Sequence, residues 1–462
     1  MKHQAETLFE IGSPSRLRKR RKPHYEWQVG GTPPVLGRHS LAKHNILSAY
    51  LQKYVQVLTR RKVIEGLKLT LVDGFAGGGL YLHPETNAEI PGSPIIMASS
   101  MQDVEKAVAA NREKQFSLDV RYLLVEKRDE TREFLKQQLK LHDATARQSA
   151  QIEVLNGSFA GHLDEILEVV KKRSRSRRVI FVLDQYGFTD VSMSDLRKIF
   201  SQLPNAEVIL TIAIDWLIDY WSESNYATTL PNLGINLTPD FANQIKQDNP
   251  FAWRPIVQYA LHNEFKQRSG AGYYTPFFIR SSEAHRAYWL LHFSGHAKAR
   301  DVMTELHFEL ANHFQHFGGP GIDMLGGLVG FDPSIDMSQN QSMLSYEFDE
   351  SAKKLTHEKL IEQLPEIVSR DYISVQDLHE QIANNMPGTL SMLVAAVECL
   401  AANNQLEIAT SNGTPRRKRS KVRSEDIVRL HRQTTCFSFE EFRAATSPGR
   451  GNGESRLNHS DV

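Results

Sequence analysis

Short apolar runs alternate with amphipathic helical stretches between residues 69 and 214, and this alternation limits the possible folds more than any other feature of the chain. We predict strands at 69–72, 120–125, 152–155, 179–183 and 207–214, and helices at 93–110, 128–141, 161–172 and 194–203. Strands that alternate with helices form a parallel sheet with right-handed crossovers. The run at 179–183 is so apolar that both faces of its strand are expected to be covered.

The pattern changes after residue 270. Two strand-like runs, 272–280 and 287–293, are separated by a short polar turn and predict a hairpin added to the parallel sheet. Farther on, three helical stretches precede a strand at 405–409 and a basic loop at 416–423. Three helices followed by a strand and a basic loop are typical of a winged helix.

These patterns predict an α/β protein with a Rossmann-like parallel sheet that ends in a late antiparallel hairpin, followed by a small winged-helix domain. The predicted organisation is a disordered basic arm at 1–26, a Rossmann-like domain at 27–330, a linker at 331–352, a winged-helix domain at 353–430 and a flexible tail at 431–462.

Composition excludes several classes of protein. The two cysteines, Cys399 and Cys436, are too few for a disulfide scaffold or a cysteine zinc site, and we expect no metal. The chain has no secretory signal at its start and no apolar run long enough to span a bilayer, so we expect a cytoplasmic protein. The 55 basic and 54 acidic residues nearly balance, but basic residues cluster at 16–22, 171–178 and 416–423, which favours local contact with a polyanion.

A glycine-rich turn follows the first predicted strand, with the sequence Asp-Gly-Phe-Ala-Gly-Gly-Gly at 73–79. It matches neither the dinucleotide-binding pattern nor a phosphate loop. An acidic residue before such a turn suits a nucleoside-type cofactor that carries a cationic group, because Asp73 can accept a hydrogen bond from an ammonium. We therefore predict that Asp73, Phe75, Gly77 and Gly79 bind a cofactor. The alternative is a tight turn without a ligand.

The next two strands end in polar groups as well. Glu126 follows the second strand, where a carboxylate can accept both ribose hydroxyls. Asn156 and Ser158 follow the third, at a position suited to an adenine ring. A solvated glutamate at a strand end is the ordinary alternative for Glu126.

The fourth strand leads into Asp184-Gln185-Tyr186-Gly187. Methyltransferases that act on amino groups of nucleic acids place an Asp or Asn, two prolines and an aromatic residue here, so that the acid accepts from the amine and the ring stacks on the flipped base. We predict these roles for Asp184 and Tyr186. The present segment is one residue shorter and has neither proline, and capping by Asp184 with packing by Tyr186 is the structural alternative.

Other polar residues are predicted to line the same cleft. Lys43 and His44 fall on the apolar stripe of a helix near residues 40–58, and Gln185 and Asp215 stand at strand ends. The sequence contains no nucleophile elbow and no zinc-protease helix that would indicate other chemistry.

With these residues in view, the chain resembles the three-Cys-motif partner family of prokaryotic proteins, which is similar to class I S-adenosylmethionine-dependent methyltransferases. The resemblance spans about residues 27–350. It is carried by His39-Ser40-x-x-Lys43-His44 before Tyr50-Leu51, Val72-Asp73-Gly74-Phe75-Ala76-Gly77-x-Gly79, Gly92-Ser93-Pro94, Val125-Glu126, Asp184-Gln185-Tyr186-Gly187 and Tyr288-Trp289-Leu290-Leu291-His292-Phe293.

The resemblance implies S-adenosylmethionine as cofactor, methyl transfer to an amino group of a nucleic-acid base, and a three-Cys-motif protein encoded nearby as partner. Family members usually have Asp-Pro-Tyr-Gly where this chain has Gln185, so the backbone carbonyl that would face the amine is less rigidly aimed. A catalytically degenerate protein that binds nucleic acid or serves as a scaffold is the alternative. Methylation of a protein or a small molecule is a third hypothesis.

The basic loop of the predicted winged helix would bind phosphates without reading sequence. The residues assigned to this role are Arg416, Arg417, Lys418, Arg419, Lys421 and Arg423. A winged helix that docks a protein, with a solvated loop, is the alternative.

Overall fold

The computed structural model describes residues 25–185, 189–213, 230, 233–237, 239–248, 253–280, 287–310, 314–317, 320–322, 345–369, 371–417 and 420–431. The chain forms two compact units, which we describe separately. The first comprises the described residues of Met1–Thr356 and of Ile382–Thr389, and the second those of His357–Gln381 and Leu390–Val462.

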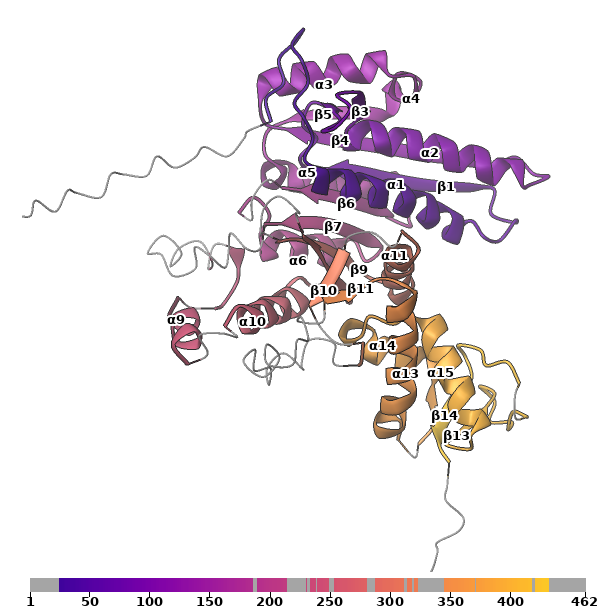
Figure 1. The fold of residues 1–462 in the computed structure, drawn as a ribbon. Helices are drawn as coiled ribbons and strands as arrows, with labels where there is room; N and C mark the ends of the chain where they lie inside the picture. Colours follow the sequence, from indigo (N-terminus) through magenta and orange to yellow (C-terminus); the bar gives the residue numbers. More distant parts are fainter. Residues whose placement is uncertain are drawn as a thin grey trace, which may run out of the picture. The chain divides into compact units, whose positions relative to one another are not determined.

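The first unit is built on a sheet that has nine strands among the described residues, in the order β11-β10-β8-β9-β7-β6-β1-β4-β5 (Figure 1). The strands are β1 (Gly66–Asp73), β4 (Ser117–Glu126), β5 (Ile152–Asn156), β6 (Val179–Asp184), β7 (Ala206–Ile212), β8 (Tyr273–Arg280), β9 (Ala287–Ser294), β10 (Phe314–Phe317) and β11 (Ser345–Glu347). Strands β5, β4, β1, β6 and β7 pair in parallel, whereas β9 is antiparallel to both β7 and β8. A parallel sheet that ends in an antiparallel hairpin is the methyltransferase-like α/β fold predicted from the sequence.

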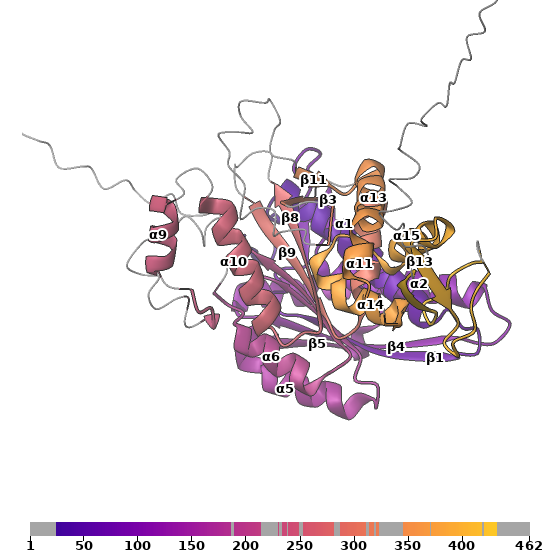
Figure 2. The same ribbon diagram turned by 90° about the horizontal axis from the view of Figure 1, so that it is seen from below.

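Helices cover both faces of this sheet (Figure 2). They are α1 (Arg38–Leu58), α2 (Ser93–Ala110), α3 (Asp129–Leu141), α4 (Asp143–Ala146), α5 (Phe159–Arg173), α6 (Met193–Gln202), α9 (Pro239–Asp248), α10 (Trp253–Arg268) and α11 (Ala297–Leu310). Helix α1 packs against α2 and α11, and α5 packs beside α6. A small hairpin of β2 (Leu80–Leu82) and β3 (Glu89–Pro91) follows the glycine-rich turn.

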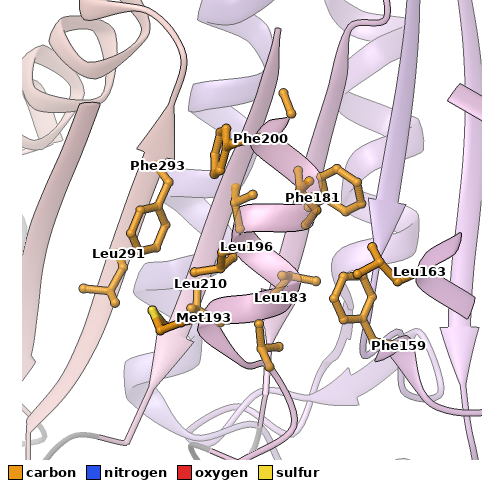
Figure 3. Packing of buried hydrophobic residues seen from close by; sticks show 14 of the residues in the cluster. Phe159, Leu163, Phe181, Leu183, Met193, Leu196, Phe200, Leu210, Leu291 and Phe293 are labelled. Atoms are coloured by element: carbon orange, nitrogen blue, oxygen red, sulfur yellow. The ribbon is translucent and has the colours of Figure 1, made fainter. Parts of the chain in front are cut away.

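The main core lies between the sheet and the pair α5 and α6 (Figure 3). Phe159 of α5 and Leu196 of α6 point toward Phe181 and Leu183 of β6, and all four side chains are buried. Residues 179–183 of β6 and the whole of β7 are buried, as their apolar sequences predict. Truncation of Phe181 to alanine would cost about 3–5 kcal/mol, because the cavity left behind adds to the lost transfer free energy. This packing fixes the positions of the strand ends.

The predicted strands and helices of the sheet domain are present, with ends shifted by a few residues. Strands β10 and β11 were not predicted, because they are short and irregular in sequence and pair at the edge of the sheet. Part of the predicted linker at 331–352 therefore belongs to the sheet, and α13 (Glu350–Ile367) begins inside it. Residue 214, the predicted end of the fifth strand, lies outside the described residues.

The second unit contains α14 (Val375–Ile382) up to Gln381, α15 (Leu390–Ala402) and the part of α13 from His357 onward. Strands β12 (Ile373–Ser374), β13 (Leu406–Ala409) and β14 (Ile427–Leu430) form an antiparallel sheet in the order β12-β14-β13. The buried side chains of Leu393, Val397 and Val428 contribute to its core. The order of helices, strands and loop agrees with the predicted winged helix, and the sequence missed β12 and β14.

No helix among the described residues is both long and apolar enough to cross a membrane. The described residues also contain no cluster of histidine, cysteine and acidic side chains that could hold a metal ion. The predicted arm at 1–26 and the tail at 431–462 lie outside the described residues, except for Tyr25, Glu26 and His431.

Candidate functional site

Three acidic residues stand at the carboxyl ends of three neighbouring strands. Asp73 is the last residue of β1, Glu126 the last of β4 and Asp184 the last of β6, and β1 lies between the other two strands. The charges of Asp184 and Glu126 both act on Asp73. In open α/β sheets this edge is where ligands bind. The structure therefore brings together the three carboxylates that the sequence assigned to one site.

Asp73 is buried, with 1% of its surface exposed. Its Oδ1 accepts a hydrogen bond from the backbone N–H of Phe75 at 3.0 Å, and its Oδ2 accepts one from Ser93 Oγ at 2.6 Å. Burial, with smaller contributions from the charges of Asp184 and Glu126, raises the pKa of Asp73 to about 7, although the two hydrogen bonds lower it. No cationic side chain among the described residues pairs with this carboxylate.

The glycine-rich turn needs its glycines for their backbone conformation. Gly77 and Gly79 have φ angles of +59° and +77°, in the left-handed region that side chains with a Cβ seldom adopt. The N–H of Gly77 donates to Glu126 Oε2 at 3.1 Å, and the N–H of Arg128 donates to Glu126 Oε1 at 2.9 Å. Glu126 therefore fixes the turn to the end of β4. Each carboxylate oxygen still has a lone pair for a further donor.

An aromatic cluster covers the turn, and sequence reasoning did not predict it. A Cβ at Gly78 would clash with the indole of Trp27, so the ring lies directly on the backbone of the turn. Trp27 Nε1 donates to the carbonyl of Leu80 at 2.7 Å, and the rings of Tyr25 and Tyr81 lie 5.9 and 5.2 Å from the Trp27 ring. The signal in the sequence was two aromatic residues, Tyr25 and Trp27, close together just after the basic run at 16–22.

Asp184 forms an ion pair with Lys43 of α1. Lys43 Nζ lies 2.6 Å from both carboxylate oxygens. The side chain of Lys43 is 10% exposed, and that of Asp184 is 34% exposed. Burial raises the pKa of Asp184, but the charge and hydrogen bonds of Lys43, with a hydrogen bond from Thr211, lower it below its ordinary value. The carboxylate is therefore ionised at neutral pH and remains accessible from solvent.

His44 adjoins this pair on α1. Burial and the charge of Lys43 lower the pKa of His44 to about 4, although Asp184 raises it. The imidazole is therefore neutral at pH 7, and its ring lies 6.1 Å from that of Tyr81. Of the two residues that the sequence assigned to the cleft from α1, Lys43 therefore contacts Asp184, and His44 lies within the influence of its charge.

Gln185 turns into the protein. It is 2% exposed, and its Oε1 accepts a hydrogen bond from the N–H of Asp190 at 3.0 Å, across residues 186–188. Its Nε2 has no partner among the described residues. The side chain thus links residue 185, directly after β6, to the backbone of Asp190. Tyr186 and Asp215, the remaining predicted residues of the cleft, lie outside the described residues.

The residues predicted to hold an adenine ring make local contacts. Asn156 Oδ1 accepts a hydrogen bond from Arg132, and Ser158 Oγ caps α5 by accepting from Gly161 N–H at 3.2 Å. The ring of Phe75 lies 6.4 Å from that of Phe159. Asn156 Oδ1 and Ser158 Oγ thus each have a partner within the protein. Contact with a cofactor remains a prediction for these two residues and for Phe75, which was predicted to bind the cofactor from the glycine-rich turn.

The basic loop of the second unit is less uniform than its sequence. Arg416 pairs with the buried Asp426 at 2.7 Å, and the other oxygen of Asp426 accepts from the N–H of Arg423 at 2.8 Å. Arg417 and Lys421 are exposed, whereas Lys418 and Arg419 lie outside the described residues. The bond to Asp426 gives Arg416 a structural contact that the count of charges could not show.

No family model matches the chain, and no curated protein matches it. Among solved structures, a Legionella pneumophila protein is 12% identical, with 58% of this chain and 91% of that chain covered and a TM-score of 0.35. A human methyltransferase 10 domain containing protein is 10% identical, with 54% and 83% covered and a TM-score of 0.24. An O-methyltransferase from Bacillus cereus in complex with SAH is 11% identical, with 54% and 80% covered and a TM-score of 0.25. Because all three TM-scores are below 0.5, the assignment to the methyltransferase-like class rests on the strand order and the late hairpin.

Proposed function

We propose that this chain is an S-adenosylmethionine-dependent methyltransferase that acts on an amino group of a nucleic-acid base. The observation that carries the proposal is the meeting of Asp73, Glu126 and Asp184 at one edge of the sheet. Two of these carboxylates have contrasting surroundings. Asp73 is buried and pairs with no cationic side chain of the described residues, and Asp184 is ionised and accessible.

The residues at the ends of β1 and β4 suit this cofactor. Its ammonium group would supply the cation that Asp73 lacks, and a ribose hydroxyl would donate to Glu126, whose oxygens retain lone pairs. When bound, S-adenosylmethionine supplies a methyl group activated by a positively charged sulfur. The left-handed glycines allow the backbone of the turn to approach a ligand closely.

Asp184 is suited to hold the amine that receives the methyl group. Its carboxylate would accept a hydrogen bond from one N–H and orient the nitrogen lone pair. The cofactor would supply the methyl group at the expense of its S–C bond, Asp184 would hold the amine that receives it, and the methylated amine would then lose a proton. His44 is neutral at pH 7 and its pKa responds to the charge of Asp184, so it is a candidate to accept that proton.

The proposal of a nucleic-acid substrate draws on the second unit. Arg417 and Lys421 are exposed on the loop between β13 and β14, where they can neutralise phosphates. Membership of the three-Cys-motif partner family, and a three-Cys-motif protein as partner, are part of the same proposal and draw on the sequence motifs.

A second candidate function is that of a catalytically degenerate scaffold or nucleic-acid-binding protein. Trp27 packs on the backbone of the glycine-rich turn, and Gln185 replaces the proline usual in the family. A turn that only supports Trp27 would need no cofactor.

Transfer of a labelled methyl group from S-adenosylmethionine to RNA and DNA tests the two candidates. We expect the purified chain, alone or with its three-Cys-motif partner, to label one class of nucleic acid. Asp184→Asn should reduce labelling strongly, and Lys106→Ala, an exposed lysine on α2, should leave it unchanged. Labelling that is absent in both settings, while the protein binds nucleic acid, would favour the scaffold.

A further inference from the structure

A cavity lies at the edge of the sheet where the parallel strands begin, opposite the edge that holds the proposed active site. It has a volume of about 210 Å³ and lies among residues of α1, the start of β7 and the start of α11. Glu207 in its wall is the second residue of β7, whereas Thr211, beside Asp184, is the sixth. Four residues of strand correspond to about 13 Å. The cavity is therefore separate from the site at the carboxyl ends of the strands.

Only one of the two side-chain oxygens of Glu207 makes hydrogen bonds to described residues. Its side chain is 8% exposed, and Oε2 accepts a hydrogen bond from the hydroxyl of Tyr50 and lies 3.2 Å from Nε2 of His292. Its Oε1 makes no hydrogen bond to a described residue, although Glu207 lines the cavity. Oε1 is not among the buried unpartnered atoms, so it is accessible from the cavity and can accept a hydrogen bond from a donor group bound there.

A second polar group in the wall also lacks a partner. Tyr54 is 8% exposed, lines the cavity, and its hydroxyl makes no hydrogen bond to a described residue. Burial raises the pKa of Tyr54, as does the charge of Glu207, whereas the charge of Arg178 lowers it. The hydroxyl is therefore protonated at neutral pH and lies within the fields of both charges.

The rest of the cavity wall contains basic side chains, opposite in charge to Glu207, and an apolar surface. Arg178 and Lys298 line the cavity, and neither forms an ion pair with a described residue. Lys298 stands in the first turn of α11, a helix of 14 residues with no acidic side chain there, so the helix dipole adds positive potential. Val57 and Val302 contribute apolar surface.

We propose that this cavity binds a small α-amino acid with an aliphatic side chain. The ammonium would donate to Glu207 Oε1, the carboxylate would lie near Arg178 and Lys298 at the start of α11, and the side chain would contact Val57 and Val302. The volume corresponds to about seven waters at ~30 Å³ each, which suits a ligand of this size. This proposal does not depend on the proposed methyl transfer.

Isothermal titration of the full chain with leucine, valine and isoleucine tests the proposal. Two analogues of leucine separate the contributions of its ends, because 4-methylpentanoate lacks the amine and isopentylamine lacks the carboxylate. We expect at least one of the three amino acids to bind. For leucine or its isomers, removal of either charged group should weaken binding by about tenfold or more, since each loses a charge-assisted hydrogen bond.

Variants locate the binding. Lys298→Ala removes an exposed cation, and Ala299→Trp fills the cavity from α11 without changing a charge; each should weaken binding by about tenfold or more. Lys106→Ala, also an exposed lysine, is the matched control and should bind normally. Asp73→Ala should bind normally too, which separates this cavity from the proposed cofactor site.

These variants avoid the buried network of Glu207, Tyr50 and His292, whose truncation could unfold the protein. The proposal would be overturned if none of the three amino acids bound to folded protein, or if the analogues bound as well as leucine. Binding that survives Lys298→Ala and Ala299→Trp, or is lost in Asp73→Ala, would also contradict it.

Discussion

The ends of strands β1 and β6 lie side by side in one sheet, yet the carboxylates at these two ends have opposite surroundings. Asp73 is buried, has two neutral donors and no cation among the residues that the structure describes, and its pKa is raised to about 7. Asp184 is one-third exposed and carries Lys43 on both oxygens, and its pKa is lowered. The first carboxylate is suited to a cation that arrives with a ligand, and the second already has its cation. Carboxylates whose pKa values are moved apart in this way are typical of sites with divided roles.

The largest effect should come from Asp184. Replacement by alanine removes the acceptor for the amine and leaves Lys43 without its partner, so we expect methyl transfer to fall by about 10²–10³-fold. Binding of S-adenosylmethionine should change little, because Asp73 and Glu126 are intact. Rates measured with saturating cofactor, beside the Lys106→Ala control, test this prediction. Full activity in the Asp184→Ala variant would show that the two strand ends do not divide the work as proposed.

The second unit contains a further carboxylate, Asp426, which resembles Asp184 in having a cationic partner. Asp426 is 1% exposed and pairs with Arg416, so Arg416→Ala would leave a buried charge short of a partner. We expect the unfolding free energy of this unit to fall by about 2 kcal/mol. The matched variant Arg417→Ala removes an exposed arginine and should change it by less than about 0.5 kcal/mol. Equal effects in urea unfolding would mean that the Arg416 pair adds no stability.

The pH dependence of stability should reveal Asp73. Folding raises the pKa of Asp73 from the ordinary 3.8 to about 7. As the pH rises, the unfolded chain therefore releases this proton at a lower pH than the folded chain does. The group therefore favours the folded state fully below about pH 4, and this contribution declines as the pH rises to 7. Between pH 5 and 7 the loss should be about 2 kcal/mol. Asp73→Asn should remove this component, which urea unfolding at both pH values would detect. An unchanged pH profile would contradict the raised pKa.

The smallest effect concerns the basic loop. Lys421→Ala should weaken binding of RNA or DNA about equally for all sequences and reduce the slope of log affinity against log salt by about 1. Lys106→Ala again serves as the control. A slope that does not change, with affinity measured at several salt concentrations, would remove Lys421 from the proposed interface.

Much of the fold followed from the sequence because strands and helices alternate with clear periods. For the same reason the sequence placed Asp73, Glu126 and Asp184 at one edge, since each ends an apolar run. Lys43 was assigned to the cleft from its helix face, but its bond to Asp184 depends on how α1 packs, 141 residues away in the chain. Long-range packing also places Trp27 over the glycine-rich turn. Arg416 looked like its neighbours, and only the fold shows the buried Asp426 beside it.

The account depends most on Asp73 as the partner of a cationic cofactor. Isothermal titration with S-adenosylmethionine and its demethylated product, S-adenosylhomocysteine, tests this directly on the wild-type chain, Asp73→Ala and Glu126→Ala. We expect micromolar binding to the wild type, about 10–100-fold weaker binding to Asp73→Ala, and weaker binding to Glu126→Ala. Affinity of the wild type should rise as the pH approaches 7, because the ionised form of Asp73 binds the ammonium. A folded wild-type protein that binds neither compound, or an Asp73→Ala variant that binds both as well as the wild type, would contradict the account.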